Sequence, residues 1–552
     1  DDAAAPGAAL PTARPGARER PSPPAASLAA APGARELEVT YGPSMQPLVG
    51  VAVGGQPLRL VFDTSSGETI VFVKEKGACL PPSLEDCYSY AVAEELGTLK
   101  VCEENNRNDQ ACTPDHPGAG LYPCDEFLRS LSDSIEHAAG KLNIDGVEYD
   151  QLVVEARENM SIELDGPQGP RSFARTRAPL RLLVRPMLPL EPGTPGTSSP
   201  LDAPSPRLFE GAGGLLGCSG RTLSCRGETL WSTLLEERNV TRFALDLQPP
   251  PDNVSGPAAP SAEAKGARRS RVVLQDIDDE FAGNIVWSQP KQIGDRFNDG
   301  MYLFLIYHPE VCGVDLLHNT SSNWLALVDT SGPCLTLPPF LFERLRAQLS
   351  ISCPFEPGAP AHGQLCSPQR GPEGRVLLPS FDFRLEDHTE PEPRTLRLPL
   401  ERLVFRDGAG REQLCVARDD GMKENSAADM TKAHIAFGSL AATAFYMVFD
   451  LANHTVGLAD KGAEGASSDG SCAPRVACRS PMQTYFPPLN VCEDPSCSDY
   501  MFMTLDEDTR TCRWSSAAPV SFAALLATLG VLDLISHRLY KQAIEKASEY
   551  CQ

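Results

Sequence analysis

Short hydrophobic runs separated by glycine, proline and polar residues dominate the chain from residue 36 onward. The stretch LVGVAVGGQPLRLVFD (residues 48–63) has the pattern of a strand, a Gly-Gly turn and a second strand, which predicts a β-hairpin. Similar strand-like runs recur, among them DQLVVEA, LRLLVRP, MYLFLIYH, WLALVD and AFYMVFD. Helical patterns are few, and LWSTLLEE and PFLFERLRAQL are the clearest. The pattern predicts a mainly β protein.

Changes in composition divide the chain into six predicted parts. Residues 1–35 are rich in Ala, Pro and Gly, with too few large apolar side chains to offset the entropy of ordering, so we expect disorder there. The other predicted boundaries are a first β-rich half at 36–270 with a cysteine-rich insertion at 79–126, a second β-rich half at 271–460, a cysteine-bearing stalk at 461–514, a transmembrane helix at 515–536 and a tail at 537–552.

The connection between the two halves ends in the basic run RRSR at residues 268–271. One interpretation is a cleavage site for a processing protease that cuts at paired basic residues. The other, which we favour, is a cluster of solvated loop charges.

The segment AAPVSFAALLATLGVLDLI (residues 517–535) is long and apolar enough to span a bilayer as a helix. Its alternatives are a buried amphipathic helix and the discarded tail of a lipid-anchor signal. His537, Arg538 and Lys541 follow the segment directly, and basic residues mark the cytoplasmic side of a span. We therefore expect a single-pass type I membrane protein whose larger part is lumenal or extracellular.

The net charge of −24 argues against a nucleic-acid partner, because the phosphate backbone requires a basic surface. The 18 cysteines have irregular spacings without a C-x2-C pair, which favours disulfides in an oxidising compartment over metal sites. Cys218 and Cys225 are close enough in sequence to be a candidate pair. Cys551 lies beyond the apolar segment and is expected to be a free thiol or an acylation site, of which we favour the free thiol. An odd number of cysteines precedes the apolar segment, so at least one of them is expected to be unpaired or bonded to another chain.

N-x-S/T sequons agree with a secretory location, although a chain of this length acquires some by chance. The candidate glycosylation sites are Asn159, Asn239, Asn253, Asn319 and Asn453.

Two hydrophobic runs, one in each half, end in the same triplet. LRLVFDTSSGETIVF carries Asp63, and WLALVDTSGPCLTLP carries Asp329. Two facing carboxylates share a proton because both cannot ionise easily at contact distance. One member then acts as a base toward water while the other donates to a carbonyl oxygen, which hydrolyses a peptide bond with neither metal nor cofactor.

The chain resembles the pepsin-like aspartic proteases over roughly residues 40–460. The resemblance rests on five segments in the family's order. They are LVGVAVGGQPLRLVFDTSSGETIVF, FEGAGGLLGCSGRTLSCRGETLWSTLLEE, RVVLQDIDDEFAGNIVW, LALVDTSGPCLTLPP and IAFGSLAATAFYMVFDLANHTVGLAD. It implies a bilobed, mainly β fold in which the two lobes meet at the Asp-Thr-Ser turns and a peptide runs through the cleft between them.

The resemblance also implies roles for residues in both turns. Asp63 and Asp329 would be the catalytic dyad, and the hydroxyls of Thr64 and Thr330 would cross-link the turns beneath it. Ser66 matches the hydroxyl that commonly hydrogen-bonds the first aspartate.

The chain departs from the family pattern at three places. Ser65 and Ser331 stand where the family has glycine, which adds a side chain beside each carboxylate. Gly332 stands where the family has a hydroxyl residue. The segment matched to the substrate-covering flap, FLRSLSDSIEHAAG, lacks the family's tyrosine.

Two functions therefore remain open. The first is a membrane-anchored aspartic endopeptidase acting on a peptide or protein substrate, with activity impaired by the serines. The second is a catalytically inactive relative that binds a ligand in the cleft or serves as a subunit of a membrane-protein complex.

Overall fold

The computed structural model describes, apart from short breaks, residues 35–73, 142–183, 211–220, 229–250, 268–289, 302–352, 366–418, 435–462, 472–497, 503–515 and 518–550, with a few residues between 87 and 101. The predicted disordered segment, most of the cysteine-rich insertion, the segment matched to a flap, Cys225 and Cys551 lie outside these residues. The described part is mainly β, as predicted.

The first half of the chain forms an eight-stranded sheet. Its strands, in spatial order, are β2 (Thr40–Tyr41), β3 (Pro47–Val53), β4 (Gln56–Asp63), β11 (Gly214–Gly217), β5 (Thr69–Phe72), β10 (Arg171–Leu183), β9 (Val153–Leu164) and β6 (Lys100–Val101). The predicted hairpin is confirmed, because β3 and β4 pair from Leu48↔Val61 to Val53↔Gln56. Gly54 and Gly55 make its turn with φ of 57° and 76°, a conformation that favours glycine.

The second half forms another eight-stranded sheet. Seven strands follow the order β22 (Leu396–Pro399), β21 (Ser380–Arg384), β15 (Leu303–Val311), β17 (Asn323–Val328), β26 (Ile435–Phe437), β18 (Leu335–Leu337) and β25 (Val416–Arg418), and β16 (Val314–Asp315) pairs with β15.

The two sheets repeat one pattern of five strands. In the first sheet, β4 pairs antiparallel with β3 and parallel with β11, β11 pairs antiparallel with β5, and β5 pairs parallel with β10. In the second, β17, β15, β26, β18 and β25 pair in the same order and the same directions. The chain therefore contains an internal structural duplication, and each copy holds one Asp-Thr-Ser turn at the end of the equivalent strand.

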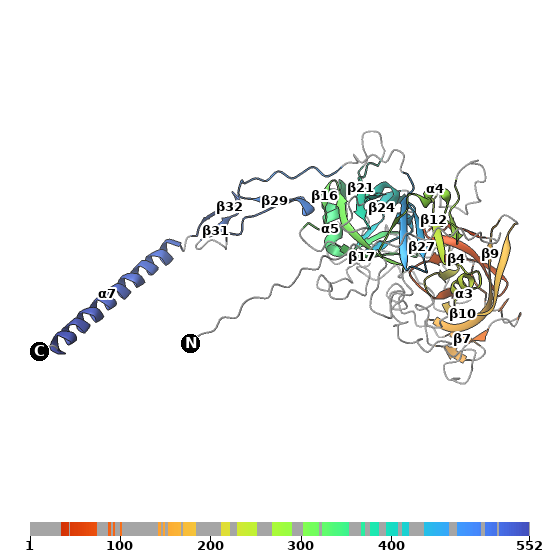
Figure 1. The fold of residues 1–552 in the computed structure, drawn as a ribbon, viewed down its shortest axis with the longest axis horizontal. Coiled ribbons are helices and arrows are strands. Elements are labelled where there is room, and N and C mark those ends of the chain that lie inside the picture. Colours follow the sequence, from red (N-terminus) through yellow and green to blue (C-terminus); the bar gives the residue numbers. More distant parts are fainter. Residues whose placement is uncertain are drawn as a thin grey trace, which may run out of the picture.

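A six-stranded sheet joins the two halves, as Figure 1 shows at β12 and β27, which lie between the red and orange strands of the first half and the green to cyan elements of the second. Its order is β1 (Glu36–Glu38), β13 (Arg271–Leu274), β12 (Arg242–Asp246), β27 (Phe445–Asp450), β28 (Thr455–Asp460) and β14 (Val286–Trp287). Strands from both halves thus share one hydrogen-bonded layer.

Helices cover the sheets, and both predicted helices are present as α3 (Leu230–Glu237) and α5 (Pro339–Gln348). Thr229 caps α3, and Trp231 packs edge-on against Phe62 of β4 and Phe243 of β12, each at 5.3 Å between ring centroids. The shorter elements are α4 (Asp279–Ala282), α6 (Ser439–Ala442), η5 (Leu400–Leu403), η7 (Pro487–Leu489), β7 (Leu142–Ile144), β8 (Val147–Tyr149), β19 (Ile351–Ser352), β20 (Ser367–Pro368), β23 (Val404–Arg406), β24 (Glu412–Leu414), β29 (Thr484–Phe486), β30 (Val491–Glu493), β31 (Met503–Asp506) and β32 (Thr511–Trp514).

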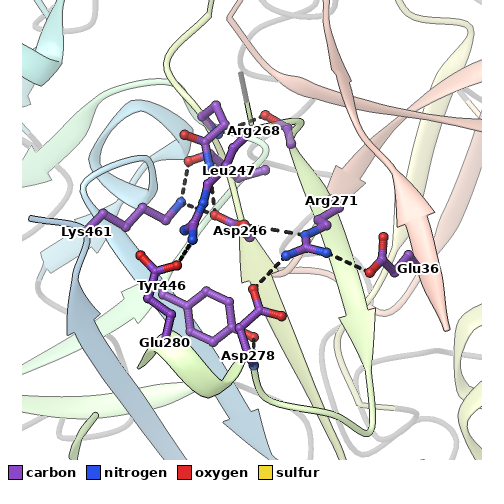
Figure 2. Close-up of polar contacts among 11 residues, drawn as sticks. Glu36, Asp246, Leu247, Arg268, Arg271, Asp278, Glu280, Tyr446 and Lys461 are labelled. Carbon is purple, nitrogen blue, oxygen red and sulfur yellow. Dashed lines mark hydrogen bonds and ion pairs between the residues drawn. The ribbon is translucent and has the colours of Figure 1, made fainter. Parts of the chain in front are cut away.

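Arg271, the last residue of the RRSR run, forms specific ion pairs. It therefore fits neither the interpretation as a cleavage site nor the interpretation as a solvated loop charge. That residue lies in β13 and its guanidinium contacts Glu36 at 2.6 Å, Asp278 at 2.6 Å and Asp246 at 3.5 Å (Figure 2). Asp246 is fully buried and is also 2.7 Å from Nζ of Lys461, which follows β28. The run is therefore part of a charge cluster that ties β1, β12, β13 and the end of β28 together.

The predicted stalk is fixed to the second half at its beginning. Cys478–Cys492 and Cys497–Cys512 are disulfides within the segment, but Cys472 is bonded to Cys312, directly after β15. Buried Gln348 of α5 donates hydrogen bonds to the carbonyls of Pro487 and Pro488 at 2.7 and 3.0 Å. Sequence spacing did not reveal this docking, because its disulfide joins residues 160 positions apart.

The C-terminal apolar segment is a single helix, α7 (Ala518–Tyr550), which lies apart from the sheets at the far end of Figure 1. Pro519–Ala547 is long and apolar enough to cross a membrane. None of it is buried against the rest of the protein, which contradicts the alternative of a buried amphipathic helix. The helix continues beyond the predicted end at residue 536. Its 33 residues extend about 50 Å, more than the roughly 30 Å hydrocarbon core of a bilayer.

Candidate functional site

Asp63 and Asp329 occupy equivalent positions in the duplicated sheets. Asp63 ends β4, and its carbonyl accepts a hydrogen bond from the backbone N–H of Cys218 at 2.7 Å. Asp329 follows β17, and its N–H donates to the carbonyl of Phe437 at 3.0 Å. Each aspartate is therefore held by the neighbouring parallel strand at the same point of its own sheet.

The two threonines bring the turns into contact, as predicted. The N–H of Thr64 donates to the Thr330 hydroxyl at 3.1 Å, and the N–H of Thr330 donates to the Thr64 hydroxyl at 3.2 Å. Each hydroxyl also donates to a carbonyl of the opposite strand, Thr64 to Val328 at 2.7 Å and Thr330 to Phe62. Both threonines are buried, so this reciprocal network fixes the two turns side by side.

Replacing Thr330 with valine is expected to destabilise the fold by about 2–3 kcal/mol, because it leaves the N–H of Thr64 and the carbonyl of Phe62 buried without their partner. Thr330→Ser retains the hydroxyl and is the matched control. Chemical unfolding of both variants measures the difference, and equal stability of the two would show that the hydroxyl network does not hold the turns together.

Two further contacts across the same seam were not expected from the sequence. The Gln46 side-chain amide, from the loop before β3, donates to the carbonyl of Ser331. The hydroxyl of Ser439, at the start of α6, donates to the carbonyl of Met45 at 2.7 Å. Neither residue belongs to a local motif, so only the placement of the two halves reveals their role.

Ser65 and Ser331 each make two hydrogen bonds to the aspartate of their own turn. The hydroxyl and the N–H of Ser65 donate to Oδ1 of Asp63 at 2.7 and 2.8 Å. The hydroxyl and the N–H of Ser331 donate to Oδ1 of Asp329 at 2.7 and 3.1 Å. The residues that replace the family's glycines therefore bind the carboxylates symmetrically.

The Ser66 hydroxyl lies close enough to Asp63 to lower its pKa, but the contact falls outside normal hydrogen-bond geometry. Within the described part of the chain, the buried Ser66 hydroxyl has no hydrogen-bond partner, and neither does Oδ2 of Asp63. Ser65 makes the expected contact instead, because its hydroxyl reaches Oδ1 directly.

Gly332 places no side chain beside Asp329. A Cβ at this position would lie 3.7 Å from Oδ2 of Asp329, which is an ordinary van der Waals distance.

The two carboxyl groups differ in environment. Asp63 is fully buried, whereas Asp329 is half-buried. Burial raises the pKa of Asp63 to about 6, and the negative charge of Asp329 adds to the rise. The hydrogen bonds from Ser65 lower the pKa of Asp63, and the nearby Ser66 hydroxyl acts in the same direction. Asp63 therefore retains its proton in mildly acidic solution.

This raised pKa predicts a pH dependence of stability. The folded protein holds the Asp63 proton more tightly than the unfolded chain, so the resulting stability is fully present below about pH 4 and is lost as the pH rises through about 6. An asparagine cannot ionise, so Asp63→Asn removes this pH dependence. Melting temperatures measured from pH 4 to 7 should fall more steeply for the unmodified chain than for Asp63→Asn, and parallel curves would contradict the assignment.

Cys218 does not form the predicted disulfide with Cys225. It has a free, fully buried thiol after β11, beside Asp63, whose charge together with burial raises the thiol pKa. The thiol donates to the carbonyl of Leu216 at 3.2 Å, and the Tyr302 hydroxyl donates to the carbonyl of Cys218 at 2.7 Å. The side chain therefore faces the core. An unpaired cysteine was expected from the odd count, but its identity was not.

Three of the five sequons lie in the described part of the chain. Asn239 and Asn453 are exposed and lie in turns, after α3 and between β27 and β28. Asn159 is half-buried in β9, and its side-chain oxygen accepts a hydrogen bond from the N–H of Arg177. Asn253 and Asn319 lie outside the described residues.

Within the described ranges, no group of three or more His, Cys, Asp or Glu side chains is arranged to hold a metal ion. The chemistry available at the seam is that of two carboxyl groups, two serine hydroxyls and the buried threonine network. No protein-family model matches the chain, and no curated protein is significantly similar to it.

Proposed function

We propose that the protein is a pepsin-like aspartic endopeptidase, with two lobes that correspond to the duplicated sheets and a C-terminal helix that anchors it in a membrane. The observation that carries the proposal is the reciprocal threonine network between two equivalent Asp-Thr-Ser turns. A buried network that joins two halves at two carboxylates supports a shared acid–base site. A structural duplication alone would not require aspartates at both positions.

The unequal burial of the carboxyl groups supports a division of roles. We assign the proton to Asp63 and the role of the base to the more exposed Asp329. Asp329 removes a proton from a water molecule, whose oxygen bonds to the peptide carbonyl carbon while Asp63 gives its proton to the carbonyl oxygen. As the carbon–nitrogen bond of this intermediate breaks, the leaving nitrogen takes the proton from Asp329, and an intermediate hydroxyl returns a proton to Asp63. Both groups regain their starting states.

The setting is a lumenal or extracellular compartment. Four disulfides among the described cysteines support an oxidising environment. Trp514 precedes α7 and is 67% exposed, and Tyr540, beside Arg538 and Lys541, is 68% exposed. Aromatic residues concentrate at both membrane interfaces and basic residues at the cytoplasmic one, which supports a type I orientation.

The second candidate function is that of an inactive relative that binds a peptide or protein without cleaving it, alone or within a membrane-protein complex. The observation that favours it is the pair of serine hydroxyls on the carboxylates, because a displacement of about 1 Å at a reacting group impairs catalysis strongly.

Peptide cleavage separates these functions. The full chain in detergent would be incubated with a mixed peptide library between pH 4 and 6, and products would be identified by mass spectrometry. We expect cleavage that a hydroxyl-containing peptide isostere inhibits. Binding of the isostere without any cleavage would establish the second function, and neither binding nor cleavage would reject the cleft as a peptide site.

A further inference from the structure

We infer that the hydroxyls of Ser65 and Ser331 act as a matched pair of clamps that keep the dyad proton off both Oδ1 atoms and lower the pH at which the dyad titrates. The catalytic consequence rests on the proposed function, but the titration of the two carboxyl groups does not. Ser65 and Ser331 are thus positioning residues for the proton.

The geometry of the two turns supports the clamps. Oδ1 of Asp63 and Oδ1 of Asp329 each accept one hydroxyl and one N–H from the serine two positions along the chain, and both hydroxyl bonds are 2.7 Å long. Hydrogen bonds to an ionised acceptor stabilise the charged form, so two donors on one oxygen disfavour a proton there. Oδ2 of Asp63 is buried without a partner in the described part of the chain, and the proton therefore resides on that atom.

Glycine at either position would supply the N–H but no hydroxyl. A hydroxyl bond to a carboxylate favours ionisation by about one pKa unit, or tenfold in proton affinity. The surrounding titratable groups are Asp329 across the seam, the Cys218 thiol and the Tyr302 hydroxyl behind it, and Glu68 beyond the first turn. These groups remain in place when the serines change, so a shift in titration reports the hydroxyls.

The test is a pH titration of the full chain in detergent by infrared difference spectroscopy, following the protonated-carboxyl band that is absent in Asp63→Asn. Ser65→Ala, Ser331→Ala and the double variant remove only hydroxyls, and Ser65→Gly also removes the Cβ. Ser288→Ala is the matched control, because it removes a buried serine hydroxyl that accepts from the N–H of Val456 on the six-stranded sheet.

We expect the apparent titration to move upward by about one pH unit in Ser65→Ala and to remain unchanged in Ser288→Ala. Ser331→Ala is expected to move it less, because the proton of this step resides on Asp63 and the Ser331 hydroxyl binds Asp329. An unchanged or downward midpoint in Ser65→Ala, or an equal shift in the control, would overturn the inference. If the double variant does not fold, the single Ser65→Ala variant decides the outcome.

Peptide cleavage by the same variants distinguishes the two proposals. If the carboxyl titration moves but neither the unmodified chain nor any variant cleaves peptides at any pH, the inference about the serine hydroxyls is supported and the endopeptidase proposal is rejected. If the unmodified chain cleaves peptides and the acidic limb of its pH profile is the same in the alanine variants, the endopeptidase proposal is supported. The inference about the serine hydroxyls is then rejected.

Discussion

Asparagine in place of Asp63 or Asp329 is expected to reduce peptide-cleavage turnover by about 10²–10⁴-fold at the optimum pH. An amide cannot take the proton of water or return it to the leaving nitrogen, so each substitution removes one half of the acid–base pair. The threonine network is made by Thr64, Thr330 and backbone groups, and so it remains in both variants. The loss should therefore appear in kcat while the melting temperature at pH 5 changes little.

Asp279→Asn is the matched control for this prediction. Asp279 lies exposed in α4, in the part of the chain that follows β13. Its replacement makes the same Asp-to-Asn change outside the seam and should leave turnover unchanged. Cleavage that persists at full rate in Asp63→Asn would show that the peptidase activity does not come from this seam.

Lys461→Met is expected to destabilise the protein by about 3–5 kcal/mol, the largest effect on stability that the structure predicts. The side chain of Lys461 is only 8% exposed, and its ammonium group lies 2.7 Å from the fully buried carboxylate of Asp246 (Figure 2). Without it, Asp246 retains a 2.9 Å hydrogen bond from the side-chain amide of Gln248 and the 3.5 Å contact with Nε of Arg271. Arg271 is itself shared with Glu36 and Asp278. An undercompensated buried charge is costly, and here it lies in the sheet that joins the two halves.

The double variant Lys461→Met/Asp246→Leu tests the reason for the loss. Removing both charges eliminates the unpaired carboxylate, so we expect the double variant to recover much of the stability lost in Lys461→Met. Urea unfolding of both variants gives the comparison. A double variant as unstable as the single one would mean that packing of the lysine stem, and not charge, stabilises this region.

Local sequence patterns were sufficient to predict the hairpin of β3 and β4, the helices α3 and α5, and the equivalent positions of Asp63 and Asp329. These features depend on residues within a few positions of one another, where alternation, turn glycines and capping act directly. The threonine contacts followed only from the resemblance, because Thr64 and Thr330 are 266 residues apart. Ser65 was recognised as a departure, but the sequence did not show which carboxylate atom its hydroxyl binds.

Long-range partners account for the features that the sequence did not predict. Asp246 is a lone acidic residue at the end of an apolar strand, and nothing nearby identifies Lys461 as its partner. Likewise Cys312 has several possible partners by spacing, and its bond to Cys472 depends on the docking of the stalk onto α5. Pairings of this kind are decided by how whole sheets pack, which hydrophobic periodicity does not encode.

A crystal structure of the full chain with a peptide isostere that carries a hydroxyl in place of the scissile carbonyl is the most direct test of the shared site. The account predicts that this hydroxyl lies within hydrogen-bond distance, about 2.6–3.2 Å, of carboxylate oxygens from both Asp63 and Asp329. A ligand bound away from the seam, or contacting one aspartate while the other faces elsewhere, would contradict it.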